Sequence, residues 1–122
     1  MGKHASNPPK VFRVNWFQRN EDGRFMWPGF GENLRVLRWV IERSQGGGKA
    51  EETPIGYVPT PASLNGDKIK ISKSDLSRLV SIDREAWRNN LKSQVEFFDK
   101  FGDHLPAGIK EEHNALAARL RA

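Results

Sequence analysis

The chain has 122 residues, of which 37% are hydrophobic and 29% are charged, and its formal net charge is +5. This length suits one small domain or part of a larger one, and the apolar content is low for a domain that completes its own core. The absence of cysteine excludes disulfides, thiolate metal sites and cysteine nucleophiles. No apolar run approaches the roughly 20 residues of a membrane span, and the first residues lack the apolar core of a secretory signal. We therefore expect a soluble cytoplasmic protein without a membrane partner.

The basic excess favours anionic partners such as nucleotides or nucleic acid. The charges are scattered, however, because acidic residues interleave with Lys and Arg along the sequence and no long basic run occurs. Interleaved charges are typical of a solvated surface. On charge alone we therefore expect no specific binding to nucleic acid.

The first thirty residues predict an irregular start followed by a strand and a turn. Residues 1–10 are polar and proline-containing, which predicts an extended start. Residues 11–17 alternate apolar and polar side chains and are rich in strand formers, so we expect a strand there. Residues 18–23 predict a turn. Residues 25–30 are apolar, but Pro28 prevents them from continuing as a central strand because proline has no N–H for the ladder.

The middle of the chain predicts one helix and a loop-rich stretch. Apolar side chains at helical spacing predict a helix over residues 32–43, and the glycines at 46–48 end it. Residues 49–67 are rich in proline and read as loop, with a short strand at 55–58.

The last third of the chain predicts helices. Ser74 is a candidate cap for a short helix over residues 75–80, and Asp83 is a good N-cap for the longest helix, which ends near Gly102. Pro106 starts a last helix that runs to the end of the sequence. The two long helices should form a hairpin. Their apolar side chains recur at helical spacing: Trp87, Leu91, Val95 and Phe98 on the first, and Ile109, Leu116 and Leu120 on the second.

These elements predict an α+β fragment in which short strands and an aromatic loop precede the helices. We expect one segment over residues 1–122. Within it we distinguish an extended start over 1–10, a strand–loop–helix unit over 11–45, a loop-rich stretch over 46–73 and a helical part over 74–122.

The stretch before the first helix concentrates aromatic residues. Such residues are often core, but glycine and proline place these on irregular backbone, where rigid planar faces can also stack on planar ligands. Both interpretations remain open from the residues alone. The aromatic residues are Trp16, Phe17, Phe25, Trp27 and Phe30.

Asn33 lies where this stretch enters the helix. The first turn of a helix has unpaired amide donors, and the Asn33 side chain offers both a donor and an acceptor. Guanine carries an O6 acceptor beside N–H donors, and adenine reverses this edge, so such a site can distinguish the two bases. Simple helix capping by Asn33 explains the residue equally well.

The run Val14-Asn15-Trp16-Phe17 followed by residues 21–33 resembles the guanine-binding region of the GTP-dependent phosphoenolpyruvate carboxykinases. The resemblance continues through Thr53-Pro54-Ile55-Gly56-Tyr57 into the last helices and covers nearly the whole chain.

The resemblance implies a guanine site. In that family three phenylalanines surround the base and an asparagine hydrogen-bonds to it. We expect backbone contacts to matter more than the Glu32 carboxylate, and supporting packing roles for Trp16 and Trp27. The implied guanine-binding residues are Phe17, Phe25, Phe30, Gly31, Glu32 and Asn33.

The resemblance also implies an activity of the complete enzyme, a cytoplasmic carboxy-lyase of gluconeogenesis. It converts oxaloacetate and GTP to phosphoenolpyruvate, GDP and carbon dioxide with Mn²⁺ or Mg²⁺, and we expect the complete enzyme to be a monomer. This chain corresponds only to the end of that enzyme. The phosphate-loop pattern GxxxxGK[ST] is absent, and Gly46-Gly47-Gly48-Lys49 reads as a linker. We therefore expect no catalytic residue and no metal ligand here, and a chain that is inactive without the missing upstream part.

Two other functions remain open from the sequence. The chain can be a small basic module that stacks single-stranded RNA on its exposed aromatics, with a steep salt dependence. It can also be a helical interaction domain that docks through the face from Trp87 to Phe98.

Overall fold

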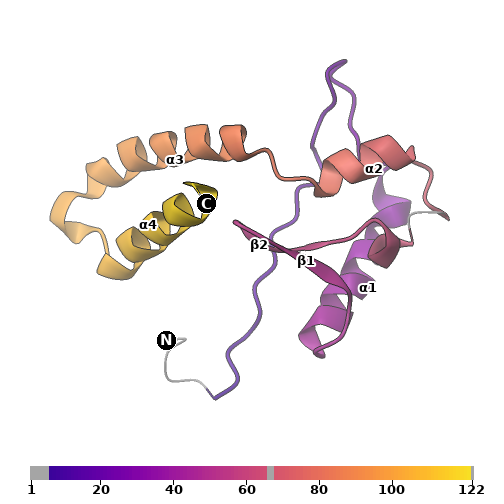
Figure 1. Cartoon of the computed structure of the whole chain (residues 1–122), viewed down its shortest axis with the longest axis horizontal. Coiled ribbons are helices and arrows are strands. Elements are labelled where there is room, and N and C mark those ends of the chain that lie inside the picture. Colours follow the sequence, from indigo (N-terminus) through magenta and orange to yellow (C-terminus); the bar gives the residue numbers. More distant parts are fainter. Residues whose placement is uncertain (1–5, 66–67, 122) are drawn as a thin grey trace. The chain divides into compact units, whose positions relative to one another are not determined.

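The computed structural model describes residues 6–65 and 68–121. It contains a two-stranded sheet and four α-helices within these residues, so the α+β class predicted from the sequence is confirmed. Short 3-10 helices lie at Phe30–Glu32, Ala62–Leu64 and Asp99–His104. In chain order the main elements are α1 (Asn33–Ser44), β1 (Ala50–Thr53), β2 (Gly56–Pro59), α2 (Lys73–Val80), α3 (Arg84–Phe98) and α4 (Ala107–Arg121) (Figure 1).

The chain forms two compact units. The first comprises the residues up to Glu51 together with Pro59–Val80, and the second comprises Glu52–Val58 together with the residues from Ser81 onward. The first unit therefore holds the aromatic stretch, α1 and α2, and the second holds the α3–α4 hairpin.

The core of the first unit is built from side chains of five separate segments. Trp39 of α1 is 4% exposed and Leu76 of α2 is 2% exposed. Their partners come from the loop before α1, the 3-10 helix after β2 and the segment before α2. The buried residues of this cluster are Trp27, Trp39, Leu64, Ile69 and Leu76.

The predicted strand at residues 11–17 is wrong. These residues are not in a strand, and the bridge nearest to them joins Arg19 to Phe25. The alternation instead reflects packing on the core. Phe12 and Trp16 are partly buried against the core, with the rings of Phe12 and Trp39 5.8 Å apart, whereas Val14 between them is 41% exposed.

The helix predicted at residues 32–43 is confirmed as α1, with each end shifted by one residue. The glycines after it end it as expected. Gly47 N–H donates to Glu42 O at 2.9 Å, and Gly46 has a φ of +87°, a backbone conformation that glycine adopts without strain.

The two strands of the structure form a hairpin. The sequence predicts one of these strands. The strand expected at 55–58 is β2, but β1 lies within residues 49–67, for which the sequence otherwise predicts a loop. Two residues join the strands, so they run antiparallel. β1 has the sequence Ala-Glu-Glu-Thr, which has no alternating pattern, and its strand conformation follows from pairing with β2.

The short helix predicted at 75–80 is α2, but its cap is Ser72 and not Ser74. Ser72 Oγ accepts a hydrogen bond from Asp75 N–H at 3.0 Å and donates to Asp75 Oδ2 at 2.7 Å. Ser72 is therefore the N-cap residue, and the Asp75 carboxylate bonds its hydroxyl, whereas in a capping box the carboxylate bonds the backbone N–H of the cap residue. The helix therefore starts earlier than predicted.

The second unit is the helical hairpin expected from the sequence. Asp83 caps α3, because its Oδ1 accepts from Ala86 N–H at 2.9 Å. Arg88 donates to Leu120 O at 3.0 Å and so ties α3 to α4, which lie side by side in Figure 1. Leu91 and Leu120 are buried between the helices. Val95 and Ile109 belong to the apolar faces predicted from the sequence, but their side chains are 44% and 45% exposed.

Candidate functional site

A tight loop between Phe17 and Phe25 divides the aromatic stretch and precedes α1 (Figure 1). Asn20 N–H donates to Arg24 O at 2.9 Å, and Gly23 N–H donates to Asn20 O at 3.0 Å. Gly23 has a φ of +75°, as a turn of this kind requires, which confirms the predicted turn. The loop brings Arg19 opposite Phe25 in a single antiparallel bridge.

The two phenylalanines at the base of this loop form an exposed ring pair. The ring centroids of Phe17 and Phe25 lie 5.9 Å apart in an edge-to-face arrangement. Phe17 is 71% exposed and Phe25 is 53% exposed. The Arg19 guanidinium lies 4.4 Å from the centroid of the Phe25 ring, a cation–π distance. Large apolar rings left in water on irregular backbone are candidate stacking surfaces.

Arg19 is a member of this cluster that the sequence interpretation missed. Its side chain also donates from Nη1 to Gly23 O at 2.9 Å, which holds the guanidinium over the loop. In the sequence, the indication of this contact is an arginine six residues before Phe25, on the other side of the predicted turn. The two side chains come together only when the turn forms, so the sequence alone does not show that they interact.

The two tryptophans of the stretch lie on the inner side. Trp27 is 8% exposed and belongs to the core cluster, and its ring lies 5.6 Å from that of Trp16. Their neighbours Phe17 and Phe25 face water. The aromatic stretch therefore has an inner pair of tryptophans and an outer pair of phenylalanines.

The turn into α1 carries the remaining predicted residues. Gly29 has a φ of +112° and is followed by the 3-10 turn Phe30–Glu32, in which Glu32 N–H donates to Gly29 O at 3.1 Å. Phe30 is 90% exposed. No ring contact between Phe30 and another aromatic residue is found in the described part of the chain. The structure therefore does not join Phe30 to the Phe17–Phe25 pair.

The side chain of Asn33 is held by a hydrogen bond from a core residue. The indole Nε1–H of Trp27 donates to Asn33 Oδ1 at 2.8 Å in a partly buried position. Glu32, its neighbour, pairs with Arg35, whose Nη2 also donates to Lys68 O at 3.0 Å. The Glu32 carboxylate is thus engaged within the protein.

The structure brings the predicted residues together in two groups. Phe17 and Phe25 form one, and the second is the consecutive turn from Phe30 to Asn33. Trp27 contacts the second group directly, because its indole donates to Asn33, and its ring lies 5.6 Å from that of Trp16, the residue before Phe17 in the sequence.

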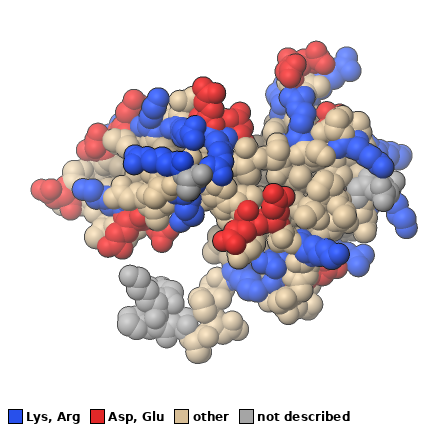
Figure 2. Space-filling view, in the orientation of Figure 1, with Lys and Arg blue, Asp and Glu red and all other residues tan. Residues whose placement is uncertain are grey.

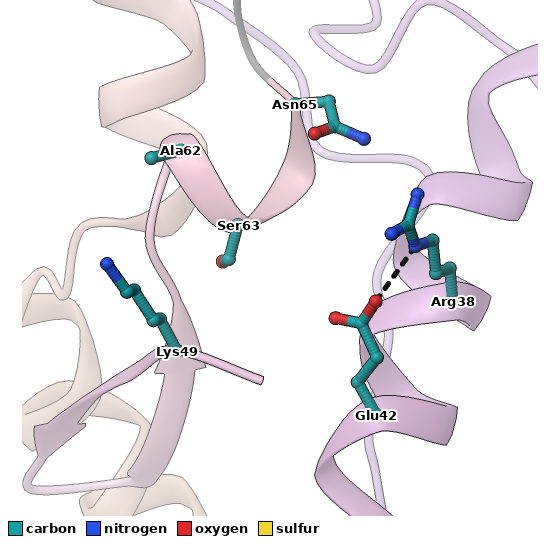
Figure 3. A pocket seen from close by; sticks show the side chains of 6 residues that line it. All are labelled: Arg38, Glu42, Lys49, Ala62, Ser63 and Asn65. Atoms are coloured by element: carbon teal, nitrogen blue, oxygen red, sulfur yellow. Dashed lines mark hydrogen bonds and ion pairs between the residues drawn. The ribbon is translucent and has the colours of Figure 1, made fainter. Parts of the chain in front are cut away.

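A separate pocket of about 300 Å³ lies elsewhere in the first unit (Figure 3). Two of its side chains, Arg38 and Glu42 of α1, are paired at 2.8 Å. The pocket shares no residue with the aromatic stretch, which is an open surface. Its lining residues are Arg38, Glu42, Lys49, Ala62, Ser63 and Asn65.

Charges of both signs are interspersed on the face shown in Figure 2. Within residues 6–65 and 68–121, no three or more His, Asp or Glu side chains are grouped so that they can hold a metal ion. In the same part of the chain, no helix is long and apolar enough to cross a membrane.

A family model described as the phosphoenolpyruvate carboxykinase C-terminal P-loop domain matches residues 1–119. The chain belongs to the GTP-dependent phosphoenolpyruvate carboxykinase family. The resemblance recognised in the sequence is therefore confirmed.

Individual members of the carboxykinase family align with most or all of the chain. A protein of Anaeromyxobacter dehalogenans (strain 2CP-C), named phosphoenolpyruvate carboxykinase [GTP], is 41% identical over 122 residues, which are 100% of this chain and 20% of the relative. Proteins of the same name from Paenarthrobacter aurescens (strain TC1) and Arthrobacter sp. (strain FB24) are 45% and 46% identical over 112 residues, which are 92% of this chain and 18% of each relative. The chain thus spans about a fifth of the length of these carboxykinases.

The glycines at 46–48 are not the phosphate loop of a carboxykinase. They follow α1 and precede β1, whereas a phosphate loop follows a strand and opens a helix.

Proposed function

We propose that residues 14–33 bind the guanine of GTP within a phosphoenolpyruvate carboxykinase that is longer than this chain. The observation that supports this most directly is the exposed Phe17–Phe25 ring pair in the same unit as Asn33, whose side chain is held by Trp27 at the start of α1. Membership of the family supports GTP as the nucleotide.

The ring pair and the helix start offer complementary interactions. Phe17, Phe25 and Phe30 present exposed aromatic surface, and base–aromatic stacking is worth about 1–3 kcal/mol per base. Gly31 and Glu32 lie in the 3-10 turn that precedes α1, and we propose that the Gly31 backbone N–H is a donor toward the base, because the first N–H groups of a helical segment have no partner within it. The Glu32 carboxylate is paired with Arg35 and its backbone N–H donates to Gly29 O, so we propose that Glu32 supports the site by fixing this turn.

The role of these residues in the reaction is orientation. In the complete enzyme, oxaloacetate and GTP are converted to phosphoenolpyruvate, GDP and carbon dioxide, and a fixed base places the triphosphate for transfer. The described residues do not fit a metal ion, so we assign Mn²⁺ or Mg²⁺ to other parts of the enzyme. We assign the groups that perform the chemistry there as well.

The remainder of the enzyme is the proposed partner of α1. Leu34, Leu37 and Ile41 form a stripe on this helix and are 72%, 46% and 57% exposed. An apolar stripe of this kind is typical of a surface that another part of the protein covers. The relatives are about five times as long as this chain, which supports cover from within the same enzyme.

The proposal is tested in a chimeric enzyme in which this chain replaces the matching segment of the Anaeromyxobacter relative. We expect Phe25→Ala to raise the KM for GTP about fivefold to a hundredfold, because one stacking face is lost. The measurement is steady-state kinetics with GTP and oxaloacetate varied separately. The chain without the rest of the enzyme is the negative control, and we expect it to show no turnover.

Phe97→Ala is the matched control. Phe97 is 54% exposed, against 53% for Phe25, and it belongs to the second unit. We expect its replacement to leave the KM for GTP unchanged. Equal KM values for GTP in the Phe25→Ala and Phe97→Ala enzymes would contradict the proposed site.

The RNA-binding alternative has less support. A single-stranded RNA site needs a continuous basic groove, whereas acidic residues interleave with Lys and Arg along the sequence, and the one face shown in Figure 2 carries charges of both signs. The alternative of a helical interaction domain rests on the face from Trp87 to Phe98, where Leu91 is already buried within the hairpin.

A further inference from the structure

The buried indole of Trp27 determines how the Asn33 side chain is oriented. Trp27 is 8% exposed, and its Nε1–H lies 2.8 Å from Asn33 Oδ1. An indole N–H only donates, so the amide atom that faces it must be the oxygen. The orientation of the Asn33 amide, which is ambiguous for many asparagines, is therefore fixed by chemistry.

This orientation leaves the Asn33 amide nitrogen as the group that can meet a ligand. No hydrogen bond from this nitrogen to another described residue is found. An NH₂ group donates and does not accept. It therefore complements the O6 acceptor of guanine and opposes the N6 amino group of adenine, which is also a donor.

The groups around Asn33 support the same selection. The Glu32 carboxylate is an acceptor that would attract the adenine amino group, but it is held by Arg35. Arg35 is held in turn by its hydrogen bond to Lys68 O at 3.0 Å. The carboxylate of the residue next to Asn33 in the sequence is thereby engaged.

We propose that Trp27 is a positioning residue for base selection, which acts by holding the amide of Asn33 with its NH₂ group toward the base. The proposal rests on the proposed function, since it concerns the same guanine site. It assigns Trp27 a role beyond packing. Without the indole N–H, the Asn33 amide can rotate so that its oxygen faces the base. The oxygen accepts a hydrogen bond from the N6 amino group of adenine.

The hydrogen bond itself is tested without any nucleotide. In ¹H–¹⁵N spectra of the full chain, we expect the Trp27 indole N–H to exchange slowly with water. We expect Asn33→Ala to shift this resonance and to speed its exchange at least tenfold, while the indole resonance of Trp39 stays in place. An unchanged Trp27 resonance in Asn33→Ala would overturn the proposal.

The effect on selection is tested by titrating the same chain with GTP and with ATP, with tripolyphosphate as the probe for phosphate binding alone. We expect Trp27→Phe to lower the ratio of GTP to ATP affinity about threefold to tenfold, which is the range for one hydrogen bond. The backbone resonances report in the same spectra whether the variant is folded.

Trp39→Phe is the matched control. Trp39 is 4% exposed in the same core, and its indole donates to Lys49 O at 2.9 Å, outside the site. This variant loses a similar buried hydrogen bond, and we expect it to keep the GTP preference. A fall of the ratio in Trp27→Phe alone supports the proposal.

These experiments distinguish a failure of the proposed function from a failure of this inference. If the unsubstituted chain binds GTP and ATP equally, and the chimeric enzyme also uses them equally, the proposed function falls and this inference falls with it. If the unsubstituted chain prefers GTP and Trp27→Phe retains that preference, the inference alone falls. If Trp27→Phe does not fold, the Asn33→Ala spectra still decide whether the indole holds the amide.

Discussion

Gly29 is the residue at which the aromatic stretch turns into α1. Its φ of +112° lies in a region that residues with a side chain rarely adopt, and a Cβ at this position would meet no atom within 4 Å. The need for glycine is therefore a matter of backbone conformation and not of space. Gly31, two residues later, has equally open surroundings but no positive φ.

This difference gives a prediction at the scale of single residues. We expect Gly29→Ala to lower the free energy of unfolding of the first unit by about 1–2 kcal/mol, because alanine is strained at this φ. Gly31→Ala is the control, and we expect a change within about 0.5 kcal/mol. Urea unfolding of the two variants measures both values. Equal losses in the two variants would contradict the assigned backbone strain.

Single residues also show what sequence reasoning can predict of a site. Phe17, Phe25, Phe30 and Asn33 were placed by a dense motif, and the structure pairs the first two of them. The link from Trp27 to Asn33 was not predicted, because a hydrogen bond between side chains six residues apart depends on how the turn at Gly29 closes. The role of these residues in guanine binding stays a prediction.

At the scale of elements, α1 has one buried face and one exposed stripe. Trp39 points into the core, while Leu34 and Ile41 are exposed. Both faces have apolar side chains at helical spacing, so the spacing predicts the helix but not which side of it is covered.

A matched pair of leucines tests this assignment. We expect Leu76→Ala in α2 to lower the free energy of unfolding by about 2–5 kcal/mol, because the side chain is 2% exposed and its loss leaves a cavity. Leu34→Ala in α1 changes the same side chain where it is 72% exposed, and we expect a change within about 0.5 kcal/mol. Thermal and urea unfolding give both values. A large loss for Leu34→Ala would show that the stripe is part of the core.

The elements that the sequence predicts correctly are those whose own residues determine where they begin and end. Asp83 has both the residue type and the position of an N-cap, and α3 begins after it. The strand predicted at 11–17 failed because an alternating pattern does not supply a partner strand. β1 was missed for the opposite reason, since its conformation comes from a partner and not from its own side chains.

At the scale of the whole molecule, the chain is a carboxykinase segment that spans about a fifth of its relatives. Its two units each have their own buried residues, and the first carries all the proposed guanine-binding residues. The exposed stripe on α1 and the exposed ring pair belong to this same unit. We infer that this unit both contacts the remainder of the enzyme and holds the base.

The central claim is that this chain recognises guanine, and tryptophan fluorescence during titration with GTP and with ATP tests it most directly. Trp16 and Trp27 lie on the inner side of the proposed site, so a bound base should change their emission. Far-UV circular dichroism on the same sample shows whether the chain is folded. We predict a folded chain whose fluorescence responds to GTP at lower concentrations than to ATP. A folded chain that responds identically to both nucleotides would contradict the account.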